Sequence, residues 1–547
     1  MQLPQPVSHP DSAEDRKHHI VVEYASKNWK PFCSISVTDI IVSFLLDHDA
    51  SEVEKFIFLP DQKKSRKATP SSDQAEIPGK SPWLDRFSRL KTSYPALIGA
   101  LNQKYPNDTH DSEIESFFLD EMPQLRAELR GAIGKRYISV FQTLGDSIRK
   151  NGQAIADPAK KIGNGSDQFF NLPERVALVA ECLIRRGKTR LVIDAIRNPF
   201  EIVFFKQRFS NFFTVAVSTS SDDREARLTD DLIKSEIRVV DDKEYPQKSK
   251  PLRTHADFVS QDIATCLQHA DIHVTNFGKS SEGKVPRLSE LTRQLVKYVC
   301  LMEHPGLVTP TNVERCMQAA FTAKLNSGCL SRQVGAVVTD DGFAIRSIGW
   351  NDVPLGQVSC LLRLYDEFLD SHGVPDKVQG PKQRQAFSKF EKDDASFRKS
   401  VLSRYGTQKH FDVTGGLPLR FCFKDEYNTH RGTDNQVHTR SLHAEENAFL
   451  QISKHGGQGL KGGKLFSTAS PCELCSKKAY QIGILDIYYV DPYPGISTDH
   501  VLGSGSAMPN LHLFSGAIGS AYHRLYLPLL PYKDEINTVA LVTNRLV

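Results

Sequence analysis

Residues 441–475 read SLHAEENAFLQISKHGGQGLKGGKLFSTASPCELC, and their pattern decides the fold of the chain around them. The segment AEENAFLQISKH has the apolar spacing of a helix, whereas GKLFSTAS is a short apolar run of strand length. The next segment, CELCSKKAYQIGI, is helical again. A helix, a strand and a second helix in this order predict an α/β unit with a buried strand.

The alternation continues on both sides of this stretch. Residues 312–325, NVERCMQAAFTAKL, predict a helix, and residues 334–350, VGAVVTDDGFAIRSIGW, predict a hairpin that turns at Asp341-Gly342. Residues 485–493, LDIYYVDPY, predict a further strand. A long charged segment, about 355–440, interrupts the pattern between the hairpin and the opening stretch. These elements predict an α/β/α domain with a large insertion.

The first half of the chain also alternates helices with strands. The segment FGKSSEGKVPRLSE, at 277–290, is polar and marks the main boundary, so we expect domains at 1–285 and 286–547. Continuous apolar strands between helices predict a parallel sheet covered on both faces. The segments that carry this pattern are PERVALVAECLIRR, TRLVIDAI, NPFEIVFFKQRF and NFFTVAVSTS.

Composition narrows the class of protein. The 547 residues are 39% hydrophobic and 24% charged, as in ordinary globular proteins. A net charge of +4 is too small to indicate a non-specific nucleic-acid binder. No apolar run approaches the ~18 residues that span a bilayer, and the N-terminus lacks the apolar core of a signal peptide. We therefore expect a cytoplasmic protein whose ten cysteines form no disulfide framework.

Three residues of the opening stretch have the chemistry of a metal site. His443, Cys472 and Cys475 offer one imidazole and two thiolates, which suit Zn²⁺. Three protein ligands leave a fourth tetrahedral position for water, as catalytic zinc sites do. Both ligand groups fall at predicted helix N-termini, where the helix dipole favours thiolates, and Pro471 fits just ahead of a helix start.

Glu445 lies too close in sequence to His443 to be the natural fourth ligand. It is better placed beside the metal-bound water, whose pKa zinc lowers to roughly 7. A carboxylate there can take a proton and pass it to a leaving group. We therefore predict that Glu445 is the catalytic proton shuttle.

A purely structural zinc is the alternative interpretation of the same residues. Structural sites usually have four protein ligands, and the chain contains no second C-x-x-C pair. A second, structural zinc in the insertion stays open, although the irregular spacing of its candidate ligands counts against it; they are Cys360, His372, His410, Cys422, His430 and His438.

The pattern H-A-E followed by P-C-x-x-C resembles the signature of zinc-dependent nucleobase deaminases. Residues 327–354, SGCLSRQVGAVVTDDGFAIRSIGWNDVP, are similar to the deoxycytidylate deaminases in particular. The resemblance implies that Ala336 lines the base pocket, that Asn351 hydrogen-bonds the sugar or the base edge, and that Arg332 contacts a phosphate. A surface salt bridge for Arg332 and a turn-forming role for Asn351 stay open. Nucleoside deaminases usually have a third cysteine where this chain has His443.

The first half resembles P-loop nucleotide kinases. LVIDAI ends a strand with an acidic residue, Asp194, and DDREARL resembles an arginine lid. The phosphate-binding loop is missing, because the only G-K-T, Gly187-Lys188-Thr189, follows a helix instead of a strand. The fold class is therefore a degenerate P-loop-kinase-like three-layer domain followed by a cytidine-deaminase-like α/β/α domain, and we predict no kinase activity.

Together the two halves resemble two-domain bacterial deaminases of phage defence. The resemblance implies zinc-dependent deamination of a free deoxycytidine nucleotide, dCTP or dCMP, by a homo-oligomer that needs neither a membrane nor nucleic acid. Two alternatives remain: a polynucleotide or tRNA deaminase, and a non-catalytic regulatory protein that zinc stabilises.

Overall fold

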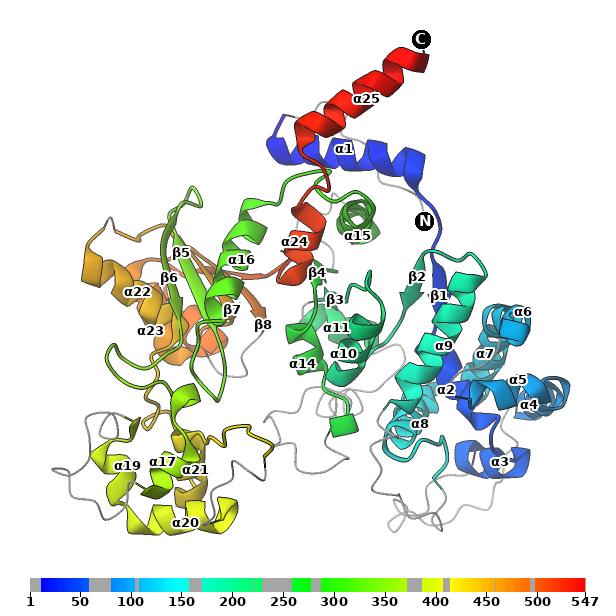
Figure 1. The fold of residues 1–547 in the computed structure, drawn as a ribbon, viewed down its shortest axis with the longest axis horizontal. Helices are drawn as coiled ribbons and strands as arrows, with labels where there is room; N and C mark the ends of the chain where they lie inside the picture. The colour runs from blue at the N-terminus through cyan, green and yellow to red at the C-terminus, as the bar shows by residue number, and fades with distance from the viewer. Residues whose placement is uncertain are drawn as a thin grey trace.

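A computed structural model describes most of the chain (Figure 1). The described residues are 11–58, 80–103, 108–156, 170–219, 221–228, 258–276, 287–370, 386–406, 414–457, 459–491 and 497–546. Among the helices within these ranges, none combines the length and the apolar character that crossing a bilayer requires.

A five-stranded sheet organises the second half of the chain. Its strand order is β6-β5-β7-β8-β9; β5 is antiparallel to both neighbours, and β7, β8 and β9 are parallel. Helix α16 packs on one face, and α22 and α23 pack on the other (Figure 1). The elements are α16 (Asn312–Lys324), β5 (Gly335–Thr339), β6 (Ile345–Trp350), α22 (Ala444–His455), β7 (Lys464–Ala469), α23 (Glu473–Ile482), β8 (Asp486–Asp491) and β9 (Asn510–Leu513).

This arrangement confirms the α/β/α layers and the hairpin that the sequence predicts. Successive residues of one strand serve opposite faces, since Leu465 packs under α22 and α23, whereas Phe466 packs under α16. The central strands β5 and β7 are buried on both faces, which is why they read as continuous apolar runs.

The insertion forms a small helical module with a core of its own. Aromatic side chains fill this core, among them Phe368, Phe397 and Phe423. The segments that precede and follow this module lie side by side, because Leu442 N donates a hydrogen bond to Asp352 O at 2.8 Å. The helices are α17 (Tyr365–Asp370), α19 (Lys389–Asp393), α20 (Ala395–Tyr405) and α21 (Phe423–Arg431).

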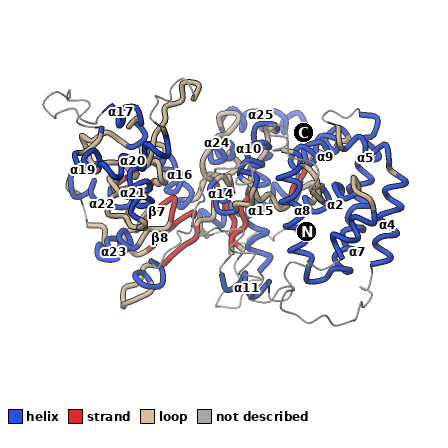
Figure 2. The backbone as a smooth tube through the Cα atoms, turned by 90° about the horizontal axis from the view of Figure 1, so that it is seen from below, coloured by secondary structure: helices blue, strands red, loops and turns tan. Residues whose placement is uncertain are grey.

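The first half is mainly helical, with short parallel strand pairs. The sequence predicts one parallel sheet there, whereas the described strands form two sheets, β1–β2 and β10–β4–β3. Each strand has only two to four residues, and the helices build a large core among themselves (Figure 2). The elements are α1 (Ala13–Asn28), β1 (Cys33–Ile35), α2 (Val37–Leu45), α3 (Ala50–Phe58), α4 (Lys80–Ser93), α5 (Pro95–Leu101), α6 (Asp111–Ser116), α7 (Met122–Ile133), α8 (Tyr137–Asn151), α9 (Asn171–Arg185), β2 (Leu191–Ile193), α10 (Pro199–Arg208), β3 (Val215–Ser218), α11 (Ser221–Leu228), α14 (Ile263–Gln268) and β4 (Ile272–Thr275).

The turn after β1 is held by Asp194, which follows β2. There Asp194 Oδ1 accepts a hydrogen bond from Val37 N at 2.7 Å, at the first residue of α2. A P-loop would turn such backbone N–H groups toward a phosphate. Gly187 and Lys188 instead close the turn after α9, as the sequence predicts for its G-K-T.

The C-terminal segment returns to the first half. Strand β10 (Gly516–Ala517) pairs antiparallel with β4, and α24 (Ser520–Tyr526) packs with α1 and α15 (Arg287–Glu303) in one core. Helix α25 (Tyr532–Leu546) follows and projects beyond α1 (Figure 1). The division at 285/286 stays a prediction, but residues 516–526 add a strand and a helix to elements before that boundary.

Glu314 joins the elements of this junction. Its buried carboxylate accepts hydrogen bonds from Lys297 Nζ at 2.9 Å, Tyr298 OH at 2.9 Å, Tyr526 OH at 2.6 Å and Ala517 N at 3.1 Å. Burial by itself would raise the pKa of Glu314, but the Lys297 charge and the hydrogen bonds outweigh it and lower the pKa to about 2.

Replacing Glu314 by glutamine should lower the free energy of unfolding at pH 7 by about 3 kcal/mol. The carboxyl has a pKa near 4.5 when unfolded and about 2 when folded, so its contribution is complete above pH 4.5 and disappears as the pH falls toward 2. Denaturant titrations from pH 7 to 2.5 should therefore show a shallower acid loss in Glu314→Gln than in the wild type. The control Glu14→Gln, at an exposed pair with Lys17, should change stability by less than about 0.5 kcal/mol.

Candidate active site

Helix α22 begins at the first residue of the site. His443 is its N-cap residue, in an extended backbone conformation, and its carbonyl accepts a hydrogen bond from Asn447 N at 2.8 Å. The bridge between Asp352 and Leu442 fixes the chain just before it. The imidazole therefore lies at the end of the sheet, at a helix N-terminus as the sequence predicts.

Strand β6 brings this helix unusually close to the sheet. A Cβ atom on Gly349 would lie 2.3 Å from Ala444 O and 2.4 Å from Ala448 N, both in the backbone of α22. Only glycine allows this approach. The position of His443 thus depends on the absence of a side chain at Gly349.

Substituting Gly349 by alanine should push α22 away from the sheet. We expect a loss of stability of about 2 kcal/mol from overpacking, together with weaker zinc retention because His443 moves with the helix. Thermal unfolding and zinc content after dialysis measure the two effects. Gly131→Ala, in α7 with no atom near the added Cβ, should lower neither stability nor zinc retention. Unchanged zinc retention in Gly349→Ala would contradict this dependence.

The two cysteines open helix α23. Cys472 is the N-cap residue, its carbonyl accepts from Ser476 N at 2.8 Å, and Cys475 lies in the first turn with only 1% of its surface exposed. Pro471 precedes the cap, as expected for a residue without an N–H. The helix start therefore directs both sulfur atoms toward His443.

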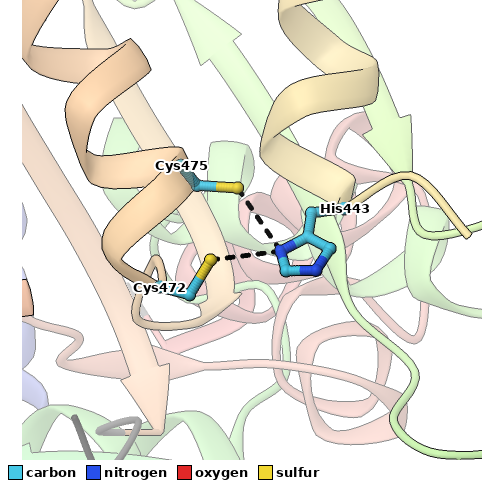
Figure 3. A group of neighbouring side chains, drawn as sticks. All are labelled: His443, Cys472 and Cys475. Carbon is cyan, nitrogen blue, oxygen red and sulfur yellow. Dashed lines mark hydrogen bonds between the residues drawn. The ribbon is translucent and has the colours of Figure 1, made fainter. Parts of the chain in front are cut away.

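The three ligand atoms are close enough to share one metal ion. His443 Nδ1 lies 3.2 Å from Cys472 Sγ and 3.5 Å from Cys475 Sγ (Figure 3). Tetrahedral zinc bonds of about 2.0–2.3 Å would separate a bound nitrogen and sulfur by about 3.5 Å. In the described part of the chain, this is the one group of at least three such side chains with all ligand atoms within 4.8 Å of one another.

The electrostatics of the cluster suit a cation. Hydrogen bonding with Cys475 and His443 lowers the pKa of Cys472 to about 3, so this sulfur is a thiolate. The neighbouring thiolate and burial raise the pKa of Cys475, and the hydrogen bond with Cys472 raises the pKa of His443. Cys475 and His443 can each give up a proton to a cation, as zinc ligands do when the metal binds.

Glu445 is buried beside the cluster, in the first turn of α22. Only 4% of the residue is exposed, and Ser467 Oγ donates to its Oε1 at 2.9 Å from the middle of β7. Burial raises the pKa of the Glu445 carboxyl, and the hydrogen bonds from Ser467 and its own backbone offset this only in part. A raised pKa makes this carboxyl a stronger proton acceptor, as a proton shuttle requires.

The sequence does not identify Ser467 as part of the site. The sequence feature that could have indicated it is a polar residue in the centre of the apolar run LFSTA. Ser467 is fully buried in β7. Such a hydroxyl needs a partner. Because that partner lies 22 residues earlier, only the fold identifies it as Glu445.

The predicted substrate contacts lie at the same end of the sheet or in it. Ala336 is fully buried on the α22 face of β5. The Asn351 amide holds the backbone before β5: its Oδ1 accepts from Val334 N at 2.7 Å and from Ser327 Oγ at 2.7 Å, and its Nδ2 donates to Arg332 O. The Arg332 side chain pairs with Asp491 at the end of β8. These contacts agree with a turn-organising Asn351 and leave its role toward a substrate a prediction.

Some of the cysteine and histidine side chains of the insertion lie close to one another. Cys360, Cys422 and His438 line one small cavity with Cys329, which precedes β5. Their ligand atoms are not as tightly grouped as those of the His443 cluster. His430 contacts Phe397 instead, and His372 and His410 lie outside the described residues.

The second half thus has the features of a zinc-dependent deaminase domain: a sheet between helical layers, a His/Cys/Cys cluster, and a buried glutamate beside that cluster. Zinc-dependent deaminases are hydrolases. Residues 310–491 match the family described as the cytidine and deoxycytidylate deaminase zinc-binding region. The second half of the chain therefore contains a cytidine/deoxycytidylate deaminase zinc-binding domain that carries His443, Cys472 and Cys475.

Phage deoxycytidylate deaminases are similar to this part of the chain. The enzyme of Enterobacteria phage T2 is 26% identical over 178 residues, which cover 32% of this chain and 78% of that protein. The phage T4 enzyme is 26% identical over 183 residues, which cover 32% of this chain and 76% of that protein. ComE operon protein 2 of Bacillus subtilis is 43% identical over 54 residues, covering 10% and 28%. The crystal structure of the dCMP deaminase from cyanophage S-TIM5 in complex with dCMP and dUMP is 22% identical in sequence, with a TM-score of 0.22. The match covers 37% of this chain and 95% of that protein.

Proposed function

We propose that this protein hydrolytically deaminates a free deoxycytidine nucleotide, dCMP or dCTP, to the corresponding uracil nucleotide. One observation carries the proposal: a buried glutamate, held by Ser467, lies beside a His/Cys/Cys cluster. Phage relatives named deoxycytidylate deaminase support the choice of a free nucleotide.

His443, Cys472 and Cys475 would hold the zinc. Zinc bound there would supply Lewis-acid activation of a water molecule. Glu445 accepts one proton from the attacking water and delivers it to ring atom N3 of cytosine as the C4–O bond forms. It then moves the second proton from the oxygen on C4 to the amino group. The C4–N bond breaks, ammonia leaves, and C4 keeps the oxygen as a carbonyl. Ser467 orients the Glu445 carboxyl during both transfers.

Residues before β5, in β5 and directly after β6 would bind the nucleotide. We assign Ala336 to the wall of the base pocket, Asn351 to the sugar or base edge, and Arg332 to the phosphate. A free nucleotide needs such a cation, because its phosphate charge is otherwise unpaired.

The biological role we propose is phage defence by depletion of deoxycytidine nucleotides. The support is the resemblance of the two halves to bacterial deaminases of that type. In the first half, Asp194 accepts the N–H at the start of α2, which accords with a domain that does not transfer phosphate.

A substrate panel tests the proposed reaction. The zinc-loaded protein is incubated with dCMP, dCTP, deoxycytidine and a cytosine-containing oligonucleotide, and uracil products are detected by mass. Conversion of dCMP or dCTP with little change in the oligonucleotide supports the proposal. Conversion of the oligonucleotide alone would indicate a polynucleotide deaminase, and no product from any substrate would indicate a non-catalytic zinc protein.

A further inference from the structure

A polar contact joins the two halves of the chain. Gln268, the last residue of α14 in the first half, donates from Nε2 to Asp491 Oδ2 at 2.8 Å. The same oxygen accepts a hydrogen bond from Arg332 Nη2. We call this chain of Gln268, Asp491 and Arg332 the α14 bridge.

The bridge lies at the end of the sheet that carries the metal ligands. Asp491 pairs in register with Ala469 at the end of β7, and its carbonyl accepts from Ser470 N at 2.9 Å, two residues before Cys472. Strand β5 is antiparallel to β7, so Arg332, which precedes β5, lies at the same end of the sheet. The first half therefore touches the deaminase domain beside its site.

The bridge fixes a long, flexible side chain at both ends. Asn351 Nδ2 donates to the carbonyl of Arg332 and so holds its backbone. Asp491, only 6% exposed, holds the guanidinium, while a third of the Arg332 side chain faces solvent. Gln268 in turn holds Asp491, through an oxygen that both donors share.

We infer that Gln268 is a positioning residue for substrate binding: acting through Asp491, it holds Arg332 where the phosphate of a nucleotide reaches it. The inference rests on the proposed function, in which Arg332 contacts that phosphate. A guanidinium that is already oriented loses less conformational freedom when it binds, so affinity increases. Without Gln268, Asp491 keeps one donor fewer and the pair can rotate. The first half would thus set the substrate affinity of the second.

The test compares Gln268→Leu with wild type on whichever nucleotide, dCMP or dCTP, is turned over. We expect KM to rise by about fivefold, the size of one modest hydrogen-bond loss, with kcat and zinc content unchanged. In an Arg332→Ala background, Gln268→Leu should have no further effect on KM.

The matched control is Gln261→Leu. Gln261 Nε2 donates to Asp146 Oδ1 at 3.1 Å, a similar bond that stays within the first half, so KM should not change. A KM of Gln268→Leu within twofold of wild type, an equal rise in Gln261→Leu, or an undiminished effect in the Arg332→Ala background would overturn the inference. Failure of the wild type to deaminate any nucleotide would instead overturn the proposed function.

Discussion

Replacing Glu445 by glutamine should reduce kcat on a deoxycytidine nucleotide by about 10³-fold or more, while zinc content stays at the wild-type level. The amide keeps the size of the side chain and can still accept the hydrogen bond from Ser467. It cannot take a proton from water and return it to the leaving amino group. Product formation by mass and zinc by elemental analysis measure the two quantities on the same sample.

The neighbouring carboxylate provides the control for this substitution. Glu446 follows Glu445 in the same helical turn but forms an ion pair with Lys478 on α23. Glu446→Gln removes the charge of the adjacent residue, and it should leave kcat within a few-fold of wild type. Loss of zinc from Glu445→Gln would mean that this carboxylate is a metal ligand, and the assigned role would be wrong.

Replacing Cys475 by serine should remove both zinc and activity. A serine hydroxyl is almost the same size but is not ionised at neutral pH, so the site loses one of its two thiolates. We expect zinc content after dialysis to fall to a small fraction of wild type and deamination to fall in proportion. This result differs from that of Glu445→Gln, which loses activity alone.

Cys316→Ser controls for the loss of a buried thiol in the same domain. Cys316 lies in α16, on the opposite face of the sheet from the cluster, and is fully buried. This variant should lose some stability but keep its zinc and its kcat. If Cys475→Ser retained zinc and wild-type turnover, the ligand set would have to be assigned to other side chains.

Local patterns in the sequence were sufficient to locate the cluster. His443 and Cys472 are N-cap residues, and both helix starts were predictable because the helical periodicity that follows each of them is a local signal. The hairpin of β5 and β6 was predictable for the same reason, since a two-strand turn is a local structure. Among the described residues of the first half, two sheets stand where the sequence predicts one, because periodicity predicts strands but not which strands pair.

Local sequence patterns thus specified the ligand types, their helix starts and the layered domain around them, since each follows from neighbouring residues. The folded chain was needed to show that Ser467 holds Glu445, that Gln268 reaches Arg332 through Asp491, and that β10 joins β4. These contacts join segments 22 to more than 200 residues apart. A donor or acceptor in the sequence does not specify its distant partner, because the path of the whole chain brings the two together.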